Sequence, residues 1–309
     1  MKINDSNIKK AVKYLNNNEC IGIPTETVYG LAANAYSNKA TKKIFNLKGR
    51  PPDNPLIVHY YNIQDMEKDC VTNALFYKLY KSLSPGPITF ILKLKNESKI
   101  SKNVTNNKKT LAVRFPNHDV TIKLLKSLNF PIAAPSANIS TKISAVSKKD
   151  VEEEFGKKIK YILNGGRSKL GLESTIINLS TRPKIIRLGA IEIEKINKVL
   201  NIKLRYSYGA KQNYPGQRKL HYSPGLPIRV NAKQARQNEA FILIKKRKIN
   251  KKNYFYLSKK KNLHEAGKNL YKTLRNIKRQ NYKFISVEKI PNVGVGRTIN
   301  DRLKRASYK

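Results

Sequence analysis

The sequence predicts an α/β protein: a twisted mixed β-sheet with helices, joined by a long linker to a small, Rossmann-like α/β domain. Short apolar runs such as Ile132-Ala133-Ala134 are typical of buried strands, and they alternate with segments whose apolar residues recur at helical spacing. The alternation lacks a strict strand–helix–strand rhythm, which favours a mixed sheet over a regular doubly wound one. Residues 201–224 show little periodicity of either kind, which is typical of a linker. We place the first domain at 1–203, the linker at 204–226 and the second domain at 227–309.

Helices are expected where apolar residues recur every three or four positions behind a capping residue. Ile8, Val12 and Leu15 form such a stripe, and Ser37 caps the next one. The helices predicted in the first domain span 5–17, 37–47, 72–83, 118–128, 147–156 and 190–200. Strands are expected at 20–23, 56–58, 88–94, 110–116, 131–134, 159–163, 171–177 and 185–189, with the polar stretch 95–109 as a loop.

The second domain follows the same rules with fewer elements. Apolar runs predict strands at 240–244, 254–257 and 284–287. Helical periodicity predicts a helix near 262–280 and a final helix that begins near Asn300.

The charge balance is strongly basic, with 63 Lys and Arg against 20 Asp and Glu and a formal net charge of +43. Such an excess suits a nucleic-acid-binding protein. However, the lysines are scattered among many Asn, Ile and Tyr residues, as an AT-rich genome would produce. Residues 225–309 hold 24 basic and 4 acidic residues, so any attraction for RNA should be strongest there.

Targeting and metal signals are weak. No apolar run approaches the ~20 residues of a membrane span, and the polar N-terminus has no signal-peptide pattern. Cys20 and Cys70 give neither a disulfide framework nor a metal-ligand pattern. We expect a cytoplasmic protein that has no membrane partner and no metal site of its own.

Polar residues cluster where predicted strands end, which is where ligands collect in α/β folds. Thr27 leaves the first strand, Arg114 lies near the end of another, and Ser136 and Asn138 follow a third. Three of these residues have an ordinary alternative: Arg114 at a solvated strand end, and Ser136 or Asn138 as a helix cap.

The segment 48–55, Lys-Gly-Arg-Pro-Pro-Asp-Asn-Pro, lies between a predicted helix and a strand. Three prolines stiffen it, and Lys48 and Arg50 are donors only. A rigid loop with two such cations suits an anion such as a phosphate, a carboxylate or bicarbonate. A proline-stiffened connector with solvated charges is the alternative.

Six motifs resemble those of the YrdC-like family, and in particular its two-domain threonylcarbamoyl-AMP synthases. The motifs are 24–31 (PTETVYGL), 48–51 (KGRP) with 54–56 (NPL), 136–138 (SAN), 172–175 (LEST), 187–189 (RLG), and 215–216 (PG) with 221–224 (HYSP). The resemblance is dense over residues 1–224 and loose over 225–309. It implies a YrdC-like sheet domain followed by the smaller domain.

The resemblance also implies an activity: L-threonine, bicarbonate or CO2, and ATP with Mg²⁺ give threonylcarbamoyl-AMP and pyrophosphate. This product is the donor for threonylcarbamoyladenosine beside the tRNA anticodon, so tRNA and the tRNA-threonylcarbamoyl transferase proteins are expected partners. The sequence lacks a Walker-type loop and a nucleophile elbow. Gathering anionic reactants in one place requires neither, because positioning and electrostatic stabilisation suffice.

The resemblance assigns roles residue by residue. The anion-binding, catalytic group comprises Lys48, Arg50 and Asn138. The L-threonine contacts are Thr27, His59, Arg114, Ala134 and Ser174. The ATP contacts are Arg50, Asn54, Thr110, Ser136, Ser144, Arg187 and, from the linker, Tyr222, which would make the linker a lid over the nucleotide.

Two departures from the family pattern and two other functions remain open. Thr141 stands where glycine is usual, which restricts a positive φ near Ser144, and Leu220 replaces a polar residue before His221. An RNA-binding module would use the basic surface, but it would be expected to interleave its cations with stacking aromatics. Carbamoyl transfer to another acceptor, as in hydrogenase maturation proteins, would need further modules that this sequence lacks.

Overall fold

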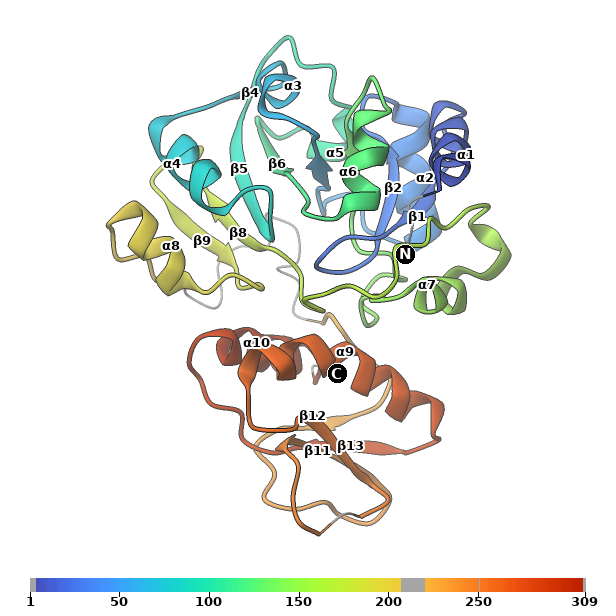
Figure 1. The fold of residues 1–309 in the computed structure, drawn as a ribbon, viewed down its shortest axis with the longest axis vertical. Helices are drawn as coiled ribbons and strands as arrows, with labels where there is room; N and C mark the ends of the chain where they lie inside the picture. Colours follow the sequence, from blue (N-terminus) through green and yellow to red (C-terminus); the bar gives the residue numbers. More distant parts are fainter. Residues whose placement is uncertain (1–3, 207–219, 250, 308–309) are drawn as a thin grey trace.

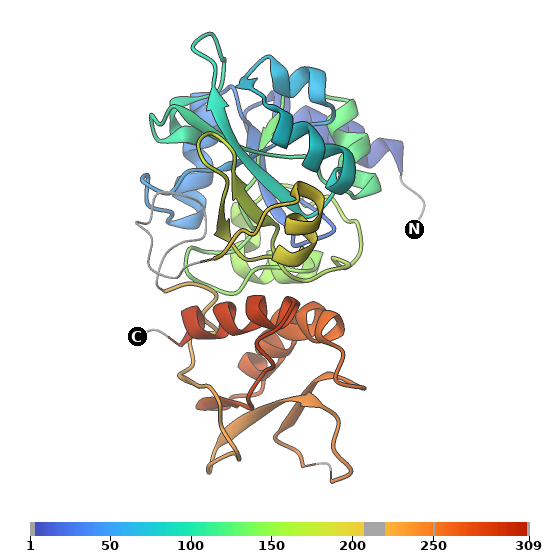
Figure 2. The same cartoon turned by 90° about the vertical axis from the view of Figure 1, so that its left-hand side faces the viewer.

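The computed structural model describes residues 4–206, 220–249 and 251–307. The chain forms two domains stacked along its long axis, the N-terminal one above the C-terminal one in Figures 1 and 2. The last helix of the upper domain ends at Leu200 and the first strand of the lower one begins at Ile228. The predicted linker, 204–226, falls between these elements, and its residues 207–219 lie outside the described ranges.

The N-terminal domain is a mixed sheet flanked by helices. Its strands are β1 (Ile21–Ile23), β2 (Gly30–Asn34), β3 (Ile57–His59), β4 (Cys70–Val71), β5 (Ile88–Leu94), β6 (Thr110–Arg114), β7 (Ile132–Ala133), β8 (Thr175–Asn178) and β9 (Lys184–Arg187). Its helices are α1 (Asp5–Asn16), α2 (Asn38–Lys48), α3 (Ile63–Glu67), α4 (Ala74–Leu83), α5 (Lys102–Thr105), α6 (Asp119–Lys126), α7 (Lys148–Phe155), the short η1 (Gly156–Lys158) and α8 (Ile193–Leu200).

The strands run in the order β1-β2-β7-β3-β6-β5-β8-β9, with β4 paired to β5. Parallel pairs (β3 with β6, β5 with β8) occur beside antiparallel ones, so the predicted mixed sheet is confirmed. In the β3–β6 pair His59 lies opposite Arg114. This register brings two predicted threonine contacts, 55 residues apart in sequence, to one edge of the sheet.

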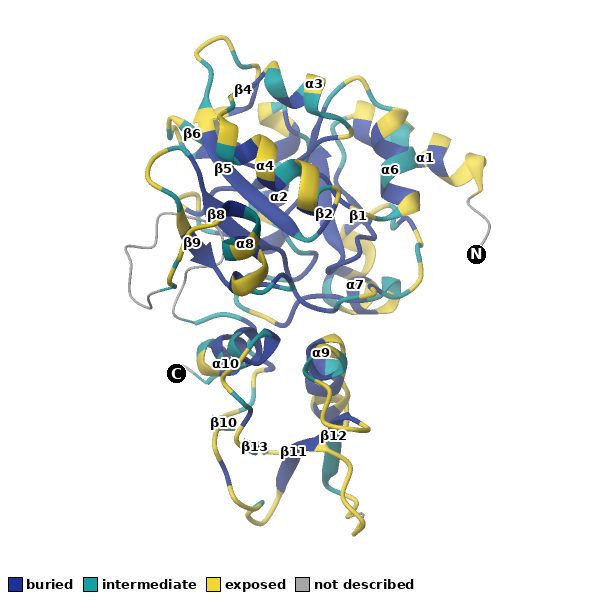
Figure 3. Cartoon of the chain, turned by 60° about the vertical axis from the view of Figure 1, so that its left-hand side comes forward, coloured by how far each residue is buried: buried dark blue, intermediate teal, exposed yellow. Residues whose placement is uncertain are grey.

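The two faces of this sheet are covered differently. Apolar residues of α2, α4 and α8 pack with the sheet into the main core, whereas α1 and α6 pack near β1, β2 and β7. A small separate cluster, Ile57, Ile91, Ala112, Ile176 and Ile186, lies on the central strands without any helix residue. Figure 3 shows the buried strands beneath helices whose outer sides are exposed. No helix covers the sheet at this cluster, and the pocket described below forms on this helix-free face.

The C-terminal domain is a four-stranded parallel sheet with two helices. Its elements are β10 (Ile228–Arg229), β11 (Glu239–Lys245), β12 (Tyr254–Ser258), α9 (Leu263–Arg279), β13 (Phe284–Val287) and α10 (Val295–Ala306), and the strand order is β10-β13-β11-β12. Both helices lie between this sheet and the N-terminal domain (Figure 1). Their buried residues share one cluster with Val28, Ile143, Val146 and Leu172 of the upper domain, so the two domains share a core.

The structure contains short elements that the sequence did not predict, namely β2, α3, β4 and β10, and it differs from the stated expectations as follows. Residues 159–163 form no strand; only a single bridge joins Ile162 to Gly22. The expected loop 95–109 contains helix α5, which buries Val104 and Thr105. The last helix begins at Val295, because Gly294, at φ 47°, precedes it. Within the described ranges, none of the helices has the length and apolar character needed to cross a membrane.

Candidate active site

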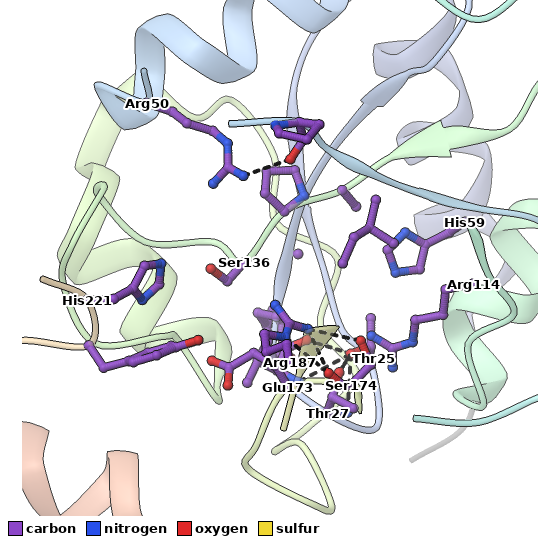
Figure 4. A pocket seen from close by; sticks show the side chains of 18 residues that line it. Thr25, Thr27, Arg50, His59, Arg114, Ser136, Glu173, Ser174, Arg187 and His221 are labelled. Atoms are coloured by element: carbon purple, nitrogen blue, oxygen red, sulfur yellow. Dashed lines mark hydrogen bonds between the residues drawn. The ribbon is translucent and has the colours of Figure 1, made fainter. Parts of the chain in front are cut away.

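A pocket opens on the helix-free face of the sheet, where β3, β6 and β9 end. In Figure 4 His59 and Arg114 lie on one side of this pocket and Arg50 and His221 on the other. The lining also includes residues that follow β1 and β7, that precede β8, and that belong to the linker.

Most of the predicted site residues meet in this lining. They are Thr27, Arg50, His59, Arg114, Ala134, Ser136, Ser174, Arg187 and Tyr222. The pocket lining does not include Lys48, Asn54, Thr110, Asn138 or Ser144. Four of these five make hydrogen bonds described below, and Thr110 begins strand β6.

The predicted anion loop is held by the end of helix α2. Ser37 caps the start of this helix by accepting from Ala40 N at 3.1 Å, and Gly49 ends it at φ 57°, where a side chain would be strained. The turn aims Arg50 back at its own loop: Nη2 donates to Asn54 Oδ1 at 2.6 Å and to Pro55 O at 2.8 Å. Asn54 thus supports the pocket through Arg50.

Lys48 is buried, 1% exposed, and donates to the carbonyls of Ser136, at 2.5 Å, and Asn138. Burial, and then the charge of Arg50, hold the pKa of Lys48 well below its usual value. Asn138 is buried as well, and its amide donates to Ile139 O and Lys142 O. Lys48 and Asn138, two of the three predicted catalytic residues, therefore shape the loop that carries Ser136.

On the opposite side of the pocket Arg114 forms a buried ion pair. Its Nη2 lies 2.7 Å from Glu26 Oε1, and both side chains are about 5% exposed. Sequence reasoning placed Arg114 in the site but assigned no role to Glu26. The signal was present, because Glu26 lies between two threonines at the end of a buried strand. Burial, and then the charge of Arg114, keep the pKa of His59 well below its usual value, which makes this imidazole neutral.

Ser174 and Arg187 meet at the floor of the pocket. Arg187 Nη2 donates to Ser174 O at 2.8 Å and to its Oγ at 3.1 Å, and this hydroxyl also lies 2.7 Å from Thr89 Oγ1. Gly189 packs so closely on this turn that an added Cβ would lie 2.2 Å from Thr175 N. A side chain at position 189 would therefore displace the strand start that carries Ser174.

Glu173 is a second carboxylate that sequence reasoning left without a role. It lines the pocket and accepts from Ser144 Oγ at 2.7 Å. Burial alone would raise its pKa, but the charges of Arg302 and Arg187 and the Ser144 hydrogen bond lower the pKa to about 2. Glu173 is therefore an anion at neutral pH, and the Ser144 hydroxyl is bonded to it.

The linker enters the site through His221 and Tyr222. Tyr222 is 1% exposed and has a φ of 64°, a left-handed conformation that costs a non-glycine residue on the order of 1–3 kcal/mol. Ser223 N donates to Thr141 O at 2.9 Å, and Thr141 itself has a φ of 70°. The threonine thus adopts the positive φ that its side chain was expected to restrict.

Several buried polar atoms of this pocket lack a hydrogen-bond partner among the described residues. They are His59 Nδ1, His221 Nδ1 and Tyr222 Oη. Glu26 Oε2, in the side chain paired with the pocket-lining Arg114, also lacks a partner among these residues. Buried polar groups are nearly always satisfied, so a group of orphaned atoms in one cavity points to a polar ligand. With Arg50, Arg114 and Arg187 in the same lining, that ligand is anionic. In the described part of the chain no group of three metal-binding side chains occurs.

Comparison with known proteins agrees with this geometry. The Sua5/YciO/YrdC family model, described as telomere recombination, matches residues 13–189. A second model, described as the threonylcarbamoyl-AMP synthase C-terminal domain, matches residues 191–307.

Full-length relatives give the same result. The threonylcarbamoyl-AMP synthase of Pyrococcus abyssi is 34% identical over 99% of this chain and 95% of its own length. The threonylcarbamoyl-AMP synthase of Bacillus subtilis is 33% identical over 99% of this chain and 94% of its own length. The putative enzyme of Methanocaldococcus jannaschii matches only 63% of this chain but 93% of its own length, so its match is confined to a part the size of one domain.

Solved structures extend the likeness to three dimensions. The crystal structure of P. abyssi Sua5 complexed with L-threonine has a TM-score of 0.90 and 32% identity, covering 99% of this chain and 96% of that one. A HypF structure, at 23% identity and a TM-score of 0.53 over 59% of this chain, shares the fold alone. From its two family domains, its full-length relatives and its fold, this chain belongs to the threonylcarbamoyl-AMP synthase family.

Proposed function

We propose that this chain catalyses the ATP-dependent synthesis of L-threonylcarbamoyl-AMP from L-threonine and bicarbonate or CO2, with release of pyrophosphate. The observation that carries the proposal is the group of unpartnered polar atoms beside three arginines in one buried pocket. The L-threonine complex of a relative with the same fold supports the choice of amino acid.

The threonine end of the pocket is assigned to Thr27, His59, Arg114, Ala134 and Ser174. Arg114 donates from Nη2 to Glu26 and from Nε to Gly86 O, and its Nη1 pairs with the amino-acid carboxylate. Glu26 Oε2, which has no partner among the described residues, accepts from the amino group. The neutral His59 adds a hydrogen-bonding group without repelling that amino group.

The chemistry needs no protein nucleophile. The threonine nitrogen bonds to the carbon of CO2, losing a proton to solvent, or to the carbon of bicarbonate, its proton leaving with the hydroxide as water; either route forms a carbamate. A carbamate oxygen then bonds to the α-phosphorus of ATP, and the bond from that phosphorus to the pyrophosphate oxygen breaks. Charge develops on phosphate oxygens, where Arg50 and Arg187 stabilise it. Ser136 and Tyr222 orient the nucleotide, supported by Asn54, Thr110 and Ser144.

Mg²⁺ enters as part of the ATP substrate. The described residues hold no cluster of three metal ligands, and Glu173 is already saturated by protein donors. Phosphate oxygens, which are hard ligands that Mg²⁺ prefers, therefore hold the ion. We place the reaction in the cytoplasm, with the product passed to a tRNA-threonylcarbamoyl transferase and then to tRNA.

The test is pyrophosphate release by the full chain with MgATP and bicarbonate, adding one amino acid at a time. We expect release only with L-threonine, and only with bicarbonate present. Arg50→Ala should lower kcat by roughly 10²–10³-fold, the usual loss for an electrostatic stabiliser, whereas the exposed Arg182→Ala should not. Release without threonine, or none with any amino acid, refutes the proposal.

A further inference from the structure

The two helices of the C-terminal domain contact the loops that carry the nucleotide-side residues. On α10, Arg302 Nη2 donates to Leu188 O at 2.6 Å and Thr298 Oγ1 to Gly189 O at 2.9 Å. On α9, Arg275 Nη2 donates to Ile143 O at 2.6 Å. These carbonyls adjoin Arg187 and Ser144 in sequence, so the C-terminal domain fixes the backbone beside both.

The same helices saturate the carboxylate of Glu173. Tyr271 Oη, from α9, lies 2.9 Å from both of its oxygens, and Arg302 Nε, from α10, lies 2.9 Å from Oε2. Ser144 Oγ supplies a further bond, at 2.7 Å to Oε1. One carboxylate thus joins the strand start at β8, the Ser144 loop and both C-terminal helices.

Tyr222 of the linker is held by the same two side chains. Its ring stacks on Tyr271, with centroids 5.7 Å apart, and the Arg302 guanidinium lies 4.6 Å from its centroid. A tyrosine at φ 64° keeps that conformation only where its surroundings fix it. Tyr271 and Arg302 are those surroundings, and the Tyr222 hydroxyl, buried without a partner among the described residues, belongs to the pocket lining.

We propose that Tyr271 and Arg302 are positioning residues for nucleotide binding, acting through Glu173 and Tyr222. This inference rests on the proposed function, because it takes the Arg187, Ser144 and Tyr222 side as the ATP side. Neither residue lines the pocket. The C-terminal domain therefore completes the nucleotide site of the other domain without touching the substrate.

The decisive variant is Tyr271→Phe, which removes one hydroxyl and keeps the stacked ring. We expect the affinity for a non-hydrolysable ATP analogue to fall roughly tenfold or more, the effect of one hydrogen bond to a charged group, and threonine affinity to change less than twofold. Arg302→Met should lower ATP affinity further. Arg302→Lys should restore part of it, because an ammonium supplies charge to Glu173 but cannot also reach Leu188 as the guanidinium fork does.

Matched controls separate positioning from general stability. Tyr282→Phe removes a hydroxyl that lies 3.3 Å from Lys252 O in the same domain. Arg297 lies on α10, as Arg302 does, and Arg297→Met removes its exposed ion pair with Glu194 of α8. Both should bind the ATP analogue as wild type does. If Arg302→Met fails to fold, Tyr271→Phe still decides.

Folded Tyr271→Phe and Arg302→Lys proteins with wild-type ATP affinity would overturn the inference. Equal losses of ATP and threonine affinity would overturn it as well, because they indicate a general structural effect. The proposed function fails separately: wild-type protein would then bind the ATP analogue yet release no threonine-dependent pyrophosphate, and the binding comparison would still test the two residues.

Discussion

The pocket and the domain interface beside it bury the same kinds of polar side chain, yet those side chains differ in how far they are satisfied. In the pocket, His59, His221 and Tyr222 each keep an atom without a partner among the described residues. At the interface, Glu173 receives three protein donors and its neighbour Asp301 pairs with Arg302 and Arg305. Buried polar groups whose hydrogen bonds are all made within the protein stabilise the fold, whereas those left without a partner mark where a ligand supplies the missing hydrogen bonds. The following substitutions test that contrast.

The largest effect is expected at Arg114, which lines the pocket but is paired. Arg114→Ala leaves the Glu26 charge buried and alone, which typically costs about 3–5 kcal/mol, so both the melting temperature and activity should fall. The double variant Arg114→Met with Glu26→Gln should regain most of the stability but no turnover. Thermal unfolding and pyrophosphate release measure the two effects. A stable, inactive Arg114→Ala single variant would contradict the role of the ion pair in the fold.

The interface should respond to acid. The pKa of Glu173 is lowered from 4.5 to about 2 in the folded protein, so its contribution is complete above pH 4.5 and is lost as the pH falls toward 2. A shift of this size corresponds to a contribution on the order of 3 kcal/mol. Stability measured by urea unfolding should drop across this window in wild type, and more weakly in Glu173→Gln. Equal losses of stability in the two proteins would show that protonation of Glu173 does not cause the acid sensitivity.

Tyr222→Phe should separate function from stability. The lost hydroxyl has no protein partner among the described residues, so stability should stay within about 0.5 kcal/mol of wild type. ATP affinity should fall about three- to tenfold, the value of one neutral hydrogen bond. Chemical denaturation and nucleotide titration measure these quantities. A clear loss of stability with unchanged affinity would place the hydroxyl in the fold instead of the site.

The smallest effect is expected at Thr141, whose φ of 70° is unfavourable for a β-branched residue. Thr141→Gly relieves strain of about 1–2 kcal/mol but adds chain entropy worth about 0.5–1 kcal/mol. The net change should be a gain of up to about 1 kcal/mol in the free energy of unfolding, with turnover unchanged. A destabilised Thr141→Gly protein would show that the threonine side chain makes a compensating contact.

The sequence predicted the strands that carry the site because they are short, apolar and bounded by Pro or polar residues, as at Ile21–Ile23 and Ile88–Leu94. It missed Gly30–Asn34 as a strand, since its small residues have little β-propensity and tertiary pairing decides. Helix α5 was not predicted because four residues are too few to show helical periodicity.

Nine of the 14 residues that the sequence placed in the site line the pocket, but their mutual contacts were not predicted. Arg114 and Ser174 were named, whereas their partners Glu26 and Thr89 emerge only from the strand register and side-chain packing. The roles of Tyr271 and Arg302 were not predictable either, because they depend on how the second domain docks. In the sequence both residues belong to ordinary amphipathic helices.

The strong positive charge of the second domain has a structural use that its composition did not reveal. In every arginine–carboxylate pair observed between the domains within the described residues, the acid belongs to the first domain and the arginine to the second. Asp150, Glu153 and Glu154 meet Arg275 and Arg279 in this way.

The covalent tether between the domains changes how strong this complementary contact has to be. A covalent tether keeps two surfaces at a high effective concentration, so the contact forms more readily within one chain than between separate proteins. The same chain cut between its domains should lose this advantage, and its halves should recombine only at high concentration and low salt.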